Sequence, residues 1–252
     1  MCFPFDAIVP DLPPGLRVIA GGAAGEPLTL TSADGTAFSA YLAPADGPTG
    51  VVVLPDVRGL FRFYEQLAER FAAAGHPAIA IDYFGRTAGL GPRDETFEYR
   101  PHVQQTTPGG VQTDVAACVQ HLRANGVTSL FTVGFCFGGR NSWLASAAGH
   151  DLAGSIGFYG RPGPGNDGTP GPIQRAGDMK APILALQGGD DPGIPVEDSQ
   201  ELDRALSEAG VEHEVVIYEG APHSFFDRKY EEFAADSVDA WNRVLAFLAR
   251  YA

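Results

Sequence analysis

The chain has 252 residues, of which 44% are hydrophobic and 19% are charged, and this balance supplies a buried core and excludes a disordered chain. Its formal net charge of −14 repels phosphate backbones and anionic lipid surfaces. We therefore expect neither nucleic acid nor a membrane as a partner.

The N-terminal part, about residues 1–48, is predicted to be rich in β-structure. Residues 27–31 and 37–42 carry alternating or β-branched side chains around the turn Asp34-Gly35, which favours an antiparallel hairpin. The pattern then changes, because residues 51–54 form a continuous apolar run, as expected for a strand buried on both faces.

The next segments alternate between helix and strand patterns. Apolar side chains at helical spacing predict a helix over residues 64–71, and residues 78–81 predict a strand. Residues 85–110 form a long polar segment with Gly and Pro, and such a segment is usually functional or partly helical. A further helix is predicted over residues 111–122.

The second half of the chain continues this alternation. Strands are expected at residues 130–135, 156–159, 183–186 and 215–218, and helices at 138–148, 202–209 and 241–248, with a Gly- and Pro-rich loop at 161–177. Repeated strand–helix alternation without a linker indicates the α/β class, with a mostly parallel central sheet and helices on both faces. We expect one domain over residues 1–252.

The sequence Gly134-Phe135-Cys136-Phe137-Gly138 lies between an apolar strand and a helix. This is the context of the nucleophile elbow G-x-S-x-G, with cysteine in the serine position. The helix N-terminus there favours a thiolate, and the N–H of Phe137 is a candidate oxyanion donor. A buried structural thiol is the alternative for a lone cysteine, but the elbow exposes its central residue.

A nucleophile of this kind needs a base and a residue that orients the base, in the chain order nucleophile, acid, histidine. Asp191 follows the strand at 183–186, and His223 follows the strand that ends at Tyr218. Both are expected at carboxyl ends of strands, where open α/β sheets keep their sites. Asp190 is a rival for the acid.

No cofactor or metal is predicted. The three cysteines, Cys2, Cys118 and Cys136, form neither a disulfide framework nor a C-x-x-C metal motif. Histidine pairs at metal-ligand spacing and the glycine-rich nucleotide motifs are also missing from the sequence. Without a basic and apolar leader or a membrane-length apolar run, we expect a cytoplasmic location, where a free thiol persists.

The sequence resembles the dienelactone hydrolase (carboxymethylenebutenolidase-like) family. The matching pieces are residues 54–59, 82–86, 134–139, 158–160, 191–192 and 223–225. The resemblance implies the α/β-hydrolase fold, a Cys136–Asp191–His223 triad with Asp191 rather than Asp190 as the acid, and the N–H of Val57 as a second oxyanion donor. It also implies hydrolysis of small esters and enol-lactones without a cofactor.

Two positions depart from this family pattern. Asp56 stands where the best-known members have a glutamate that is thought to hold the resting cysteine. Those members also bind the dienelactone carboxylate with two arginines, and Asp227 takes the place of one of them, with Arg228 beside it. Arg100 lies in the loop that carries the other, so Arg100 and Arg228 are candidate substitutes.

Further candidates for substrate contact come from aromatic and polar residues near the expected strand ends. We expect the aromatic rings to shape an apolar pocket, with core packing as the alternative for each, and the histidine to line it from the long loop. These candidates are Phe84, Arg86, His102, Tyr159 and Phe225.

Two hypotheses on function follow. The first is a cysteine-dependent hydrolase of a small ester, lactone or thioester that works through an acyl-enzyme, as a monomer or a small homo-oligomer. The second is a redox-sensing or small-molecule-binding protein on the same fold, because an exposed reactive cysteine is also typical of redox sensors. No second cysteine lies close to Cys136 in the sequence, which counts against redox sensing.

Overall fold

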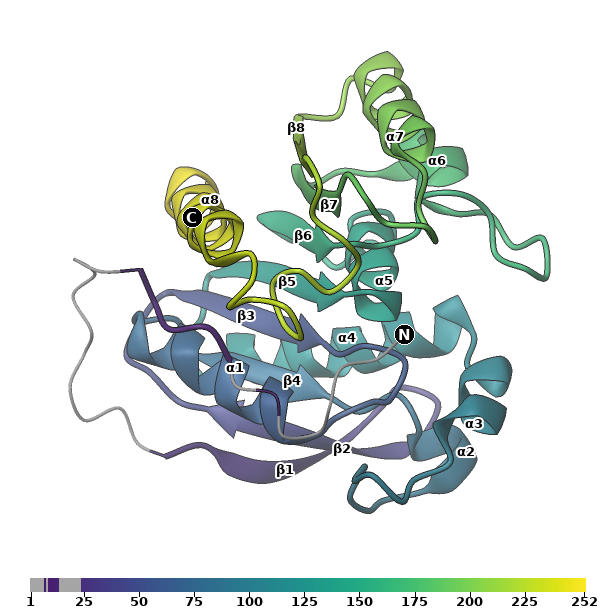
Figure 1. The fold of residues 1–252 in the computed structure, drawn as a ribbon. Helices are drawn as coiled ribbons and strands as arrows, with labels where there is room; N and C mark the ends of the chain where they lie inside the picture. Colours follow the sequence, from purple (N-terminus) through teal and green to yellow (C-terminus); the bar gives the residue numbers. More distant parts are fainter. Residues whose placement is uncertain (1–6, 8, 14–23) are drawn as a thin grey trace.

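Eight strands form one sheet in the order β1-β2-β4-β3-β5-β6-β7-β8 in the computed structural model, which describes residues 7, 9–13 and 24–252 (Figure 1). β1 and β2 pair antiparallel, β2 pairs antiparallel with β4, and all other neighbours are parallel. The strands are β1 Glu26–Thr31, β2 Ala37–Ala43, β3 Thr49–Leu54, β4 Ala78–Ile81, β5 Ser129–Phe135, β6 Gly154–Phe158, β7 Ile183–Gly188 and β8 His213–Tyr218. Cys2 and most of the segment before residue 24 lie outside the described residues.

Helices cover both faces of this sheet, as the alternating sequence pattern predicts (Figure 1). They are α1 Arg62–Ala73, α2 Gly85–Ala88, α3 Tyr99–Gln105, α4 Pro108–Ala124, α5 Phe137–Ala145, α6 Pro172–Arg175, α7 Val196–Glu208 and α8 Ala234–Tyr251, with a 3₁₀ turn at Ala176–Asp178. The mostly parallel sheet between two helical layers confirms the expected fold class.

Alternate side chains of β3 pack into the hydrophobic cores on the two faces of the sheet. Val51 and Val53 pack in the core formed with α1 and α8, where the Phe71 and Trp241 rings meet at 5.2 Å. Val52 and Leu54 pack on the opposite face, in the core formed with α4. Successive side chains of a strand point to opposite faces, so a strand covered on both sides is apolar throughout.

Two segments without a clear sequence period contain helices. The long segment from residue 85 is partly helical, as one of its two expected forms, since it contains α2, α3 and the start of α4. The 161–177 segment, predicted as a loop, ends in α6, which begins at Pro172. Proline is favoured at the first position of a helix because its fixed backbone angle suits that turn, so Pro172 starts a helix inside a breaker-rich segment.

β6 ends one residue earlier than expected, and this leaves Tyr159 in the turn that follows the strand, with a backbone φ of 36°. The carboxyl ends of β3, β5, β6, β7 and β8 all meet at one edge of the sheet. The loops that leave this edge carry the candidate site. In the described part of the chain, the helices are too short or too polar for any of them to cross a membrane.

Candidate active site

Cys136 occupies a tight turn between β5 and α5, with backbone angles φ 55° and ψ −111° that few non-glycine residues adopt. The two glycines of the elbow are required by close backbone contacts. A Cβ on Gly134 would lie 2.0 Å from the carbonyl oxygen of Gly138, and one on Gly138 would lie 2.0 Å from that of Leu54. The turn is therefore closed by contacts that only glycine permits, and Cys136 is held at the N-terminus of α5.

His223 and Asp191 come together from the loops that follow β8 and β7. The Nδ1 atom of His223 lies 2.6 Å from Oδ2 of Asp191, and the other carboxylate oxygen accepts the N–H of Gly193 at 2.8 Å. Asp191 is buried, whereas Asp190 is exposed and uses its N–H to bind the carbonyl oxygen of Ala221. The partner of His223 is thus Asp191 and not its rival Asp190.

The third member of this group is the Cys136 thiol. Burial opposes the charged form of the imidazole, but hydrogen bonds to Asp191 and to Cys136, together with their negative charges, outweigh burial and raise the pKa of His223 to about 10. At neutral pH the imidazole is then protonated, and it lies between a carboxylate and a sulfur atom. This arrangement places a histidine that is oriented by a carboxylate beside the sulfur atom, as nucleophilic catalysis by a cysteine requires.

A pocket of about 680 Å³ opens over this group and is lined by Val57, Cys136, Phe137, Tyr159 and His223, among others. Phe137 is the first residue of α5, so its N–H has no partner within the helix. Gly138 packs against the carbonyl oxygen of Leu54, the last residue of β3. Val57 lies in the loop that follows this strand and lines the same pocket. Both residues expected to supply oxyanion donors therefore line the same pocket as the thiol.

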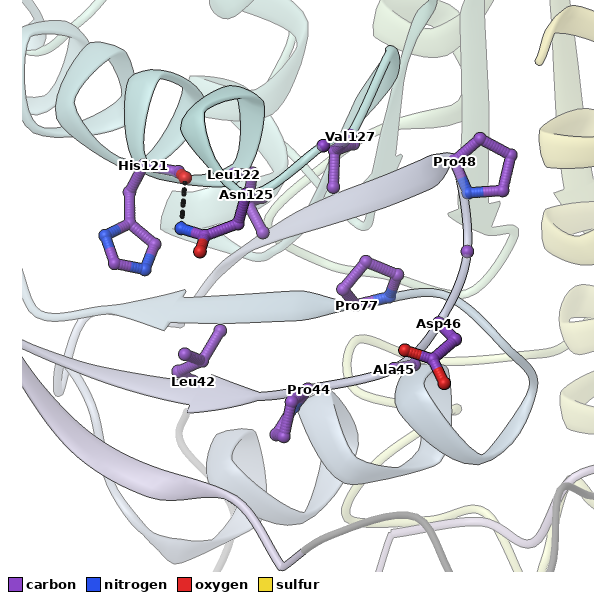
Figure 2. A pocket seen from close by; sticks show the side chains of 12 residues that line it. Leu42, Pro44, Ala45, Asp46, Pro48, Pro77, His121, Leu122, Asn125 and Val127 are labelled. Atoms are coloured by element: carbon purple, nitrogen blue, oxygen red, sulfur yellow. Dashed lines mark hydrogen bonds between the residues drawn. The ribbon is translucent and has the colours of Figure 1, made fainter.

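A second pocket of about 480 Å³ lies at the opposite edge of the sheet (Figure 2). It is formed where β2 ends, where β3 and β4 begin, and by the end of α4. Its walls include Leu42, Pro44, Asp46, Pro77, His121 and Asn125. The amide of Asn125 binds the backbone carbonyl of His121 at 2.8 Å, which completes the helix end. This pocket lies at the amino ends of the parallel strands, away from Cys136.

Comparison with known proteins identifies the family of the chain. The sequence model of the dienelactone hydrolase family matches residues 38–252, which is most of the chain. The chain belongs to the dienelactone hydrolase family. It is therefore an α/β-hydrolase, and an enzyme that acts as a carboxylic ester hydrolase of the dienelactone hydrolase kind.

Individual relatives support this membership. A protein of Escherichia coli strain K12 named "Putative carboxymethylenebutenolidase" is 32% identical over 226 residues, covering 85% of this chain and 82% of that protein. The crystal structure of a "Putative Dienelactone Hydrolase" from Klebsiella pneumoniae has a TM-score of 0.77 at 27% identity, covering 90% of this chain and 100% of that one. An esterase of Pyrococcus furiosus, with a TM-score of 0.66 at 16% identity and coverage of 90% and 92%, shares the fold.

At the position where the dienelactone hydrolase resemblance expects an arginine, Asp227 is buried and accepts a hydrogen bond from the Tyr159 hydroxyl at 2.5 Å. Burial raises the pKa of Asp227 to about 6, although the bonds from Tyr159 and from the N–H of Arg228 work in the opposite direction. The Tyr159 ring lies 4.8 Å from the His223 ring. Asp227 thus fixes the tyrosine that packs against the histidine.

Asp56, at the position of the family glutamate, pairs with Arg58. The guanidinium Nη2 of Arg58 lies 2.9 Å from the Asp56 carboxylate, and the N–H of Arg58 donates to the same carboxylate at 2.8 Å. Both residues are buried, and the Arg58 guanidinium lies 4.3 Å from the Phe61 ring centroid. The contacts of this carboxylate in the described residues are with Arg58 and not with Cys136.

The other sequence-predicted residues lie outside the pocket over Cys136. Phe84 and Phe225 are fully buried in the core, and Arg228 is exposed. Arg86 binds Asp34 and Asp114, and so ties the β1–β2 turn to α4.

Arg100 and His102 are both on α3. Arg100 lines a separate small pocket with Phe97 and Tyr99. The His102 ring stacks on Phe97 at 5.1 Å, while the adjacent Val103 faces the main pocket. Helix α3 therefore contributes to the wall of the main pocket, but through Val103 and Gln104, which the sequence did not single out.

Sequence reasoning also missed two arginines of the main pocket. Arg140 lies on the first turn of α5, and Arg161 lies in the loop after β6. Arg140 could have been predicted from the sequence, because it follows Cys136 by four residues and therefore lies on the same helix face. Arg161 carried no sequence signal, because it sits in a Gly- and Pro-rich loop without periodicity.

Proposed function

We propose that the protein is a cysteine-dependent hydrolase that cleaves a small ester, lactone or thioester through an acyl-enzyme on Cys136. The observation that carries this proposal is that Cys136 and His223 line one pocket, with the buried Asp191 bound to the far side of the His223 ring and the thiol on a strained elbow. A base beside the nucleophile and a carboxylate behind the base form the arrangement that nucleophilic catalysis needs.

In the first half of the reaction, the Cys136 sulfur attacks the substrate carbonyl carbon and forms a C–S bond. The electron pair of the carbonyl moves onto its oxygen, where the N–H groups of Val57 and Phe137 stabilise the charge. When this intermediate collapses, the C–O bond to the alcohol breaks, or the C–S bond to the thiol if the substrate is a thioester. The protonated His223 gives its proton to the leaving oxygen or sulfur, and a leaving oxygen remains attached to the acyl chain if the substrate is a lactone.

In the second half, the neutral His223 accepts a proton from water, and the resulting hydroxide attacks the thioester carbon. The C–S bond breaks, and the sulfur leaves as a thiolate beside the imidazolium. The carboxylic acid is released, and the starting pair is restored without a cofactor. Asp191 holds the imidazole in one orientation through both halves and stabilises its charge.

The test is the hydrolysis of p-nitrophenyl acetate by the wild type and by Cys136→Ala. We expect the substitution to lower kcat by about 10⁴-fold, as loss of a nucleophile does in hydrolases of this type. Cys118→Ala is the matched control, because Cys118 is a fully buried residue of α4. Unchanged turnover in Cys136→Ala would show that the proposal is wrong.

Mass spectrometry separates this function from redox sensing. An acetyl group on Cys136 in a rapidly quenched reaction supports the acyl-enzyme. A peroxide-dependent change without an esterase burst would instead support a redox sensor. The hydrolase is the stronger proposal because a histidine oriented by a buried carboxylate supplies the base that hydrolysis needs, and because no second cysteine lies close to Cys136 in the sequence.

A further inference from the structure

The wall of the main pocket next to α5 is cationic. Arg140 follows Cys136 by one helical turn, and its N–H donates to the Cys136 carbonyl oxygen at 3.2 Å. Side chains of a helix tilt toward its N-terminus, so the Arg140 side chain starts on the face that carries the nucleophile. Arg161 reaches the same pocket from the loop after β6.

The guanidinium of Arg140 is fixed in place with part of its hydrogen-bonding capacity unused. Its Nη1 atom donates to the backbone carbonyl oxygens of Arg161, at 3.1 Å, and of Gly163. Its Nη2 atom is buried and has no hydrogen-bond partner among the described residues. Buried donors are nearly always paired, so this N–H group is one that an acceptor on a ligand could satisfy.

The charge of this wall is also not neutralised. The buried arginines Arg58 and Arg93 each pair with an aspartate, whereas Arg140 forms no ion pair within the part of the chain that the structure describes. Burial and the neighbouring charge of Arg161 lower the pKa of Arg140, although Asp167 works in the opposite direction.

The hydrogen bonds of Arg161 and Asp167, the two charged residues near Arg140, do not remove the excess positive charge of this wall. Arg161 itself donates to the neutral amide oxygen of Asn166 at 2.7 Å. The Asp167 carboxylate accepts from the N–H of Thr169 at 3.1 Å and from its hydroxyl, and it is exposed. The wall therefore has two cations and one carboxylate that is already hydrogen-bonded.

We propose that Arg140 and Arg161 form a subsite for an oxyanion carried by the substrate, and that they make the enzyme selective for esters or lactones with an apolar body and an anionic end. This inference rests on the proposed hydrolase function. Val57, Val103 and Ile194 line the same pocket and offer apolar surface for the body of such a substrate. The subsite is on α5 and the loop after β6, not at positions 100 and 227–228.

The net charge of the chain would disfavour such a substrate, and a local cationic subsite counteracts this. At −14 the protein repels anions at long range, and a guanidinium inside the pocket offsets that repulsion where the substrate binds. A carboxylate or a phosphate group would fit, because guanidinium groups bind both through charge-assisted hydrogen bonds.

The test compares pairs of esters that differ by one charge. p-Nitrophenyl butyrate and p-nitrophenyl hemisuccinate have acyl chains of equal length, and phenyl butyrate and 4-carboxyphenyl butyrate place the charge on the leaving group. We expect Arg140→Gln to lower kcat/KM for the anionic member of at least one pair by about 30-fold, mainly through KM, and for the neutral members by less than about threefold. We expect Arg161→Gln to act in the same direction by about fivefold, because its guanidinium is exposed. Arg250→Gln is the control, since that exposed arginine pairs with Glu212 far from the site.

Equal losses on charged and neutral esters, or a wild type that never prefers the charged member, would overturn the subsite. A measurement on the wild type alone covers the case in which Arg140→Gln does not fold. Succinate and propyl phosphate should inhibit p-nitrophenyl butyrate hydrolysis competitively and separate the two anion classes, whereas butyramide should inhibit less than either; equal inhibition by all three would count against the subsite. Failure of the hydrolase proposal is distinct, because it would appear as neutral-ester turnover that survives Cys136→Ala.

Discussion

The two pockets lie at opposite edges of one sheet and differ less in size than in chemistry. The pocket at the carboxyl ends of the parallel strands, of about 680 Å³, contains Cys136, His223 and two arginines. The pocket at the amino ends, of about 480 Å³, has walls of proline, aliphatic side chains and a helix end (Figure 2). The direction of the strands, rather than the cavity volume, accounts for this chemical difference between the pockets. Loops at the carboxyl ends of parallel strands bring functional residues from several strands to one point.

The strongest test of this contrast is Asp191→Asn at the carboxyl-end pocket. An amide keeps the shape but removes the charge that stabilises the protonated His223, and it can hold the wrong tautomer. We expect kcat for p-nitrophenyl acetate to fall by about 1,000-fold with little change in the melting temperature. Asp190→Asn is the control, since Asp190 is exposed beside the same strand end. If both variants retain full activity, the Asp191 carboxylate does not contribute to catalysis at the carboxyl-end pocket.

The second test concerns the glycine that closes the elbow. In Gly138→Ala the added methyl group would lie 2.0 Å from the Leu54 carbonyl oxygen and 2.3 Å from that of Pro55, and backbone atoms cannot easily move away. We expect a loss of about 3 kcal/mol in the free energy of unfolding, measured with urea, and a loss of activity. Gly109→Ala on α4 has open space around its Cβ and should be neutral or stabilising. Similar unfolding curves for both variants would show that the elbow tolerates a side chain.

The third test is pH-dependent and uses the buried Asp227. Burial raises its pKa from the ordinary 3.8 to about 6, so the folded state favours the protonated acid. This stabilisation is complete below about pH 4 and is lost as the pH rises through 6. Asparagine cannot ionise, so the stability of Asp227→Asn relative to the wild type should increase by about 2 kcal/mol from pH 4 to pH 7.

Urea unfolding at both pH values measures this difference for Asp227→Asn. Asp46→Asn, at the rim of the amino-end pocket, is the control, because that carboxylate is exposed. A relative stability that stays constant for Asp227→Asn would mean that its carboxyl does not change its ionisation on folding over this range.

The smallest effects are expected at the amino-end pocket. His121→Ala removes a partly exposed ring from its wall and leaves the backbone carbonyl that binds Asn125. We expect kcat/KM to stay within about twofold and the free energy of unfolding to change by less than about 0.5 kcal/mol. A loss of activity larger than tenfold would indicate that this pocket also serves the enzyme.

The features that could be predicted from the sequence are those set by local pattern. The apolar runs of β3 and β5, the elbow around Cys136 and the order of Asp191 and His223 follow from residues close together in the chain or from a fixed strand order. The Tyr159–Asp227 bond joins residues 68 positions apart, so no local pattern could indicate it. Helix α3 was missed because it is short, and Pro101 lies in its first turn where a breaker would be assumed.

Backbone conformation has a consequence for efforts to make this enzyme more robust. Of the four described non-glycine residues with positive φ, Cys136, Tyr159 and Ser224 surround the site, and only Asp151 lies elsewhere. Such conformations are unfavourable and persist because the surrounding fold enforces them. Selection for heat resistance alone would reward substitutions that relax these turns, and it would do so at the expense of turnover. A library screened for both properties would therefore vary the Asp151 region and leave the three turns at the carboxyl edge unchanged.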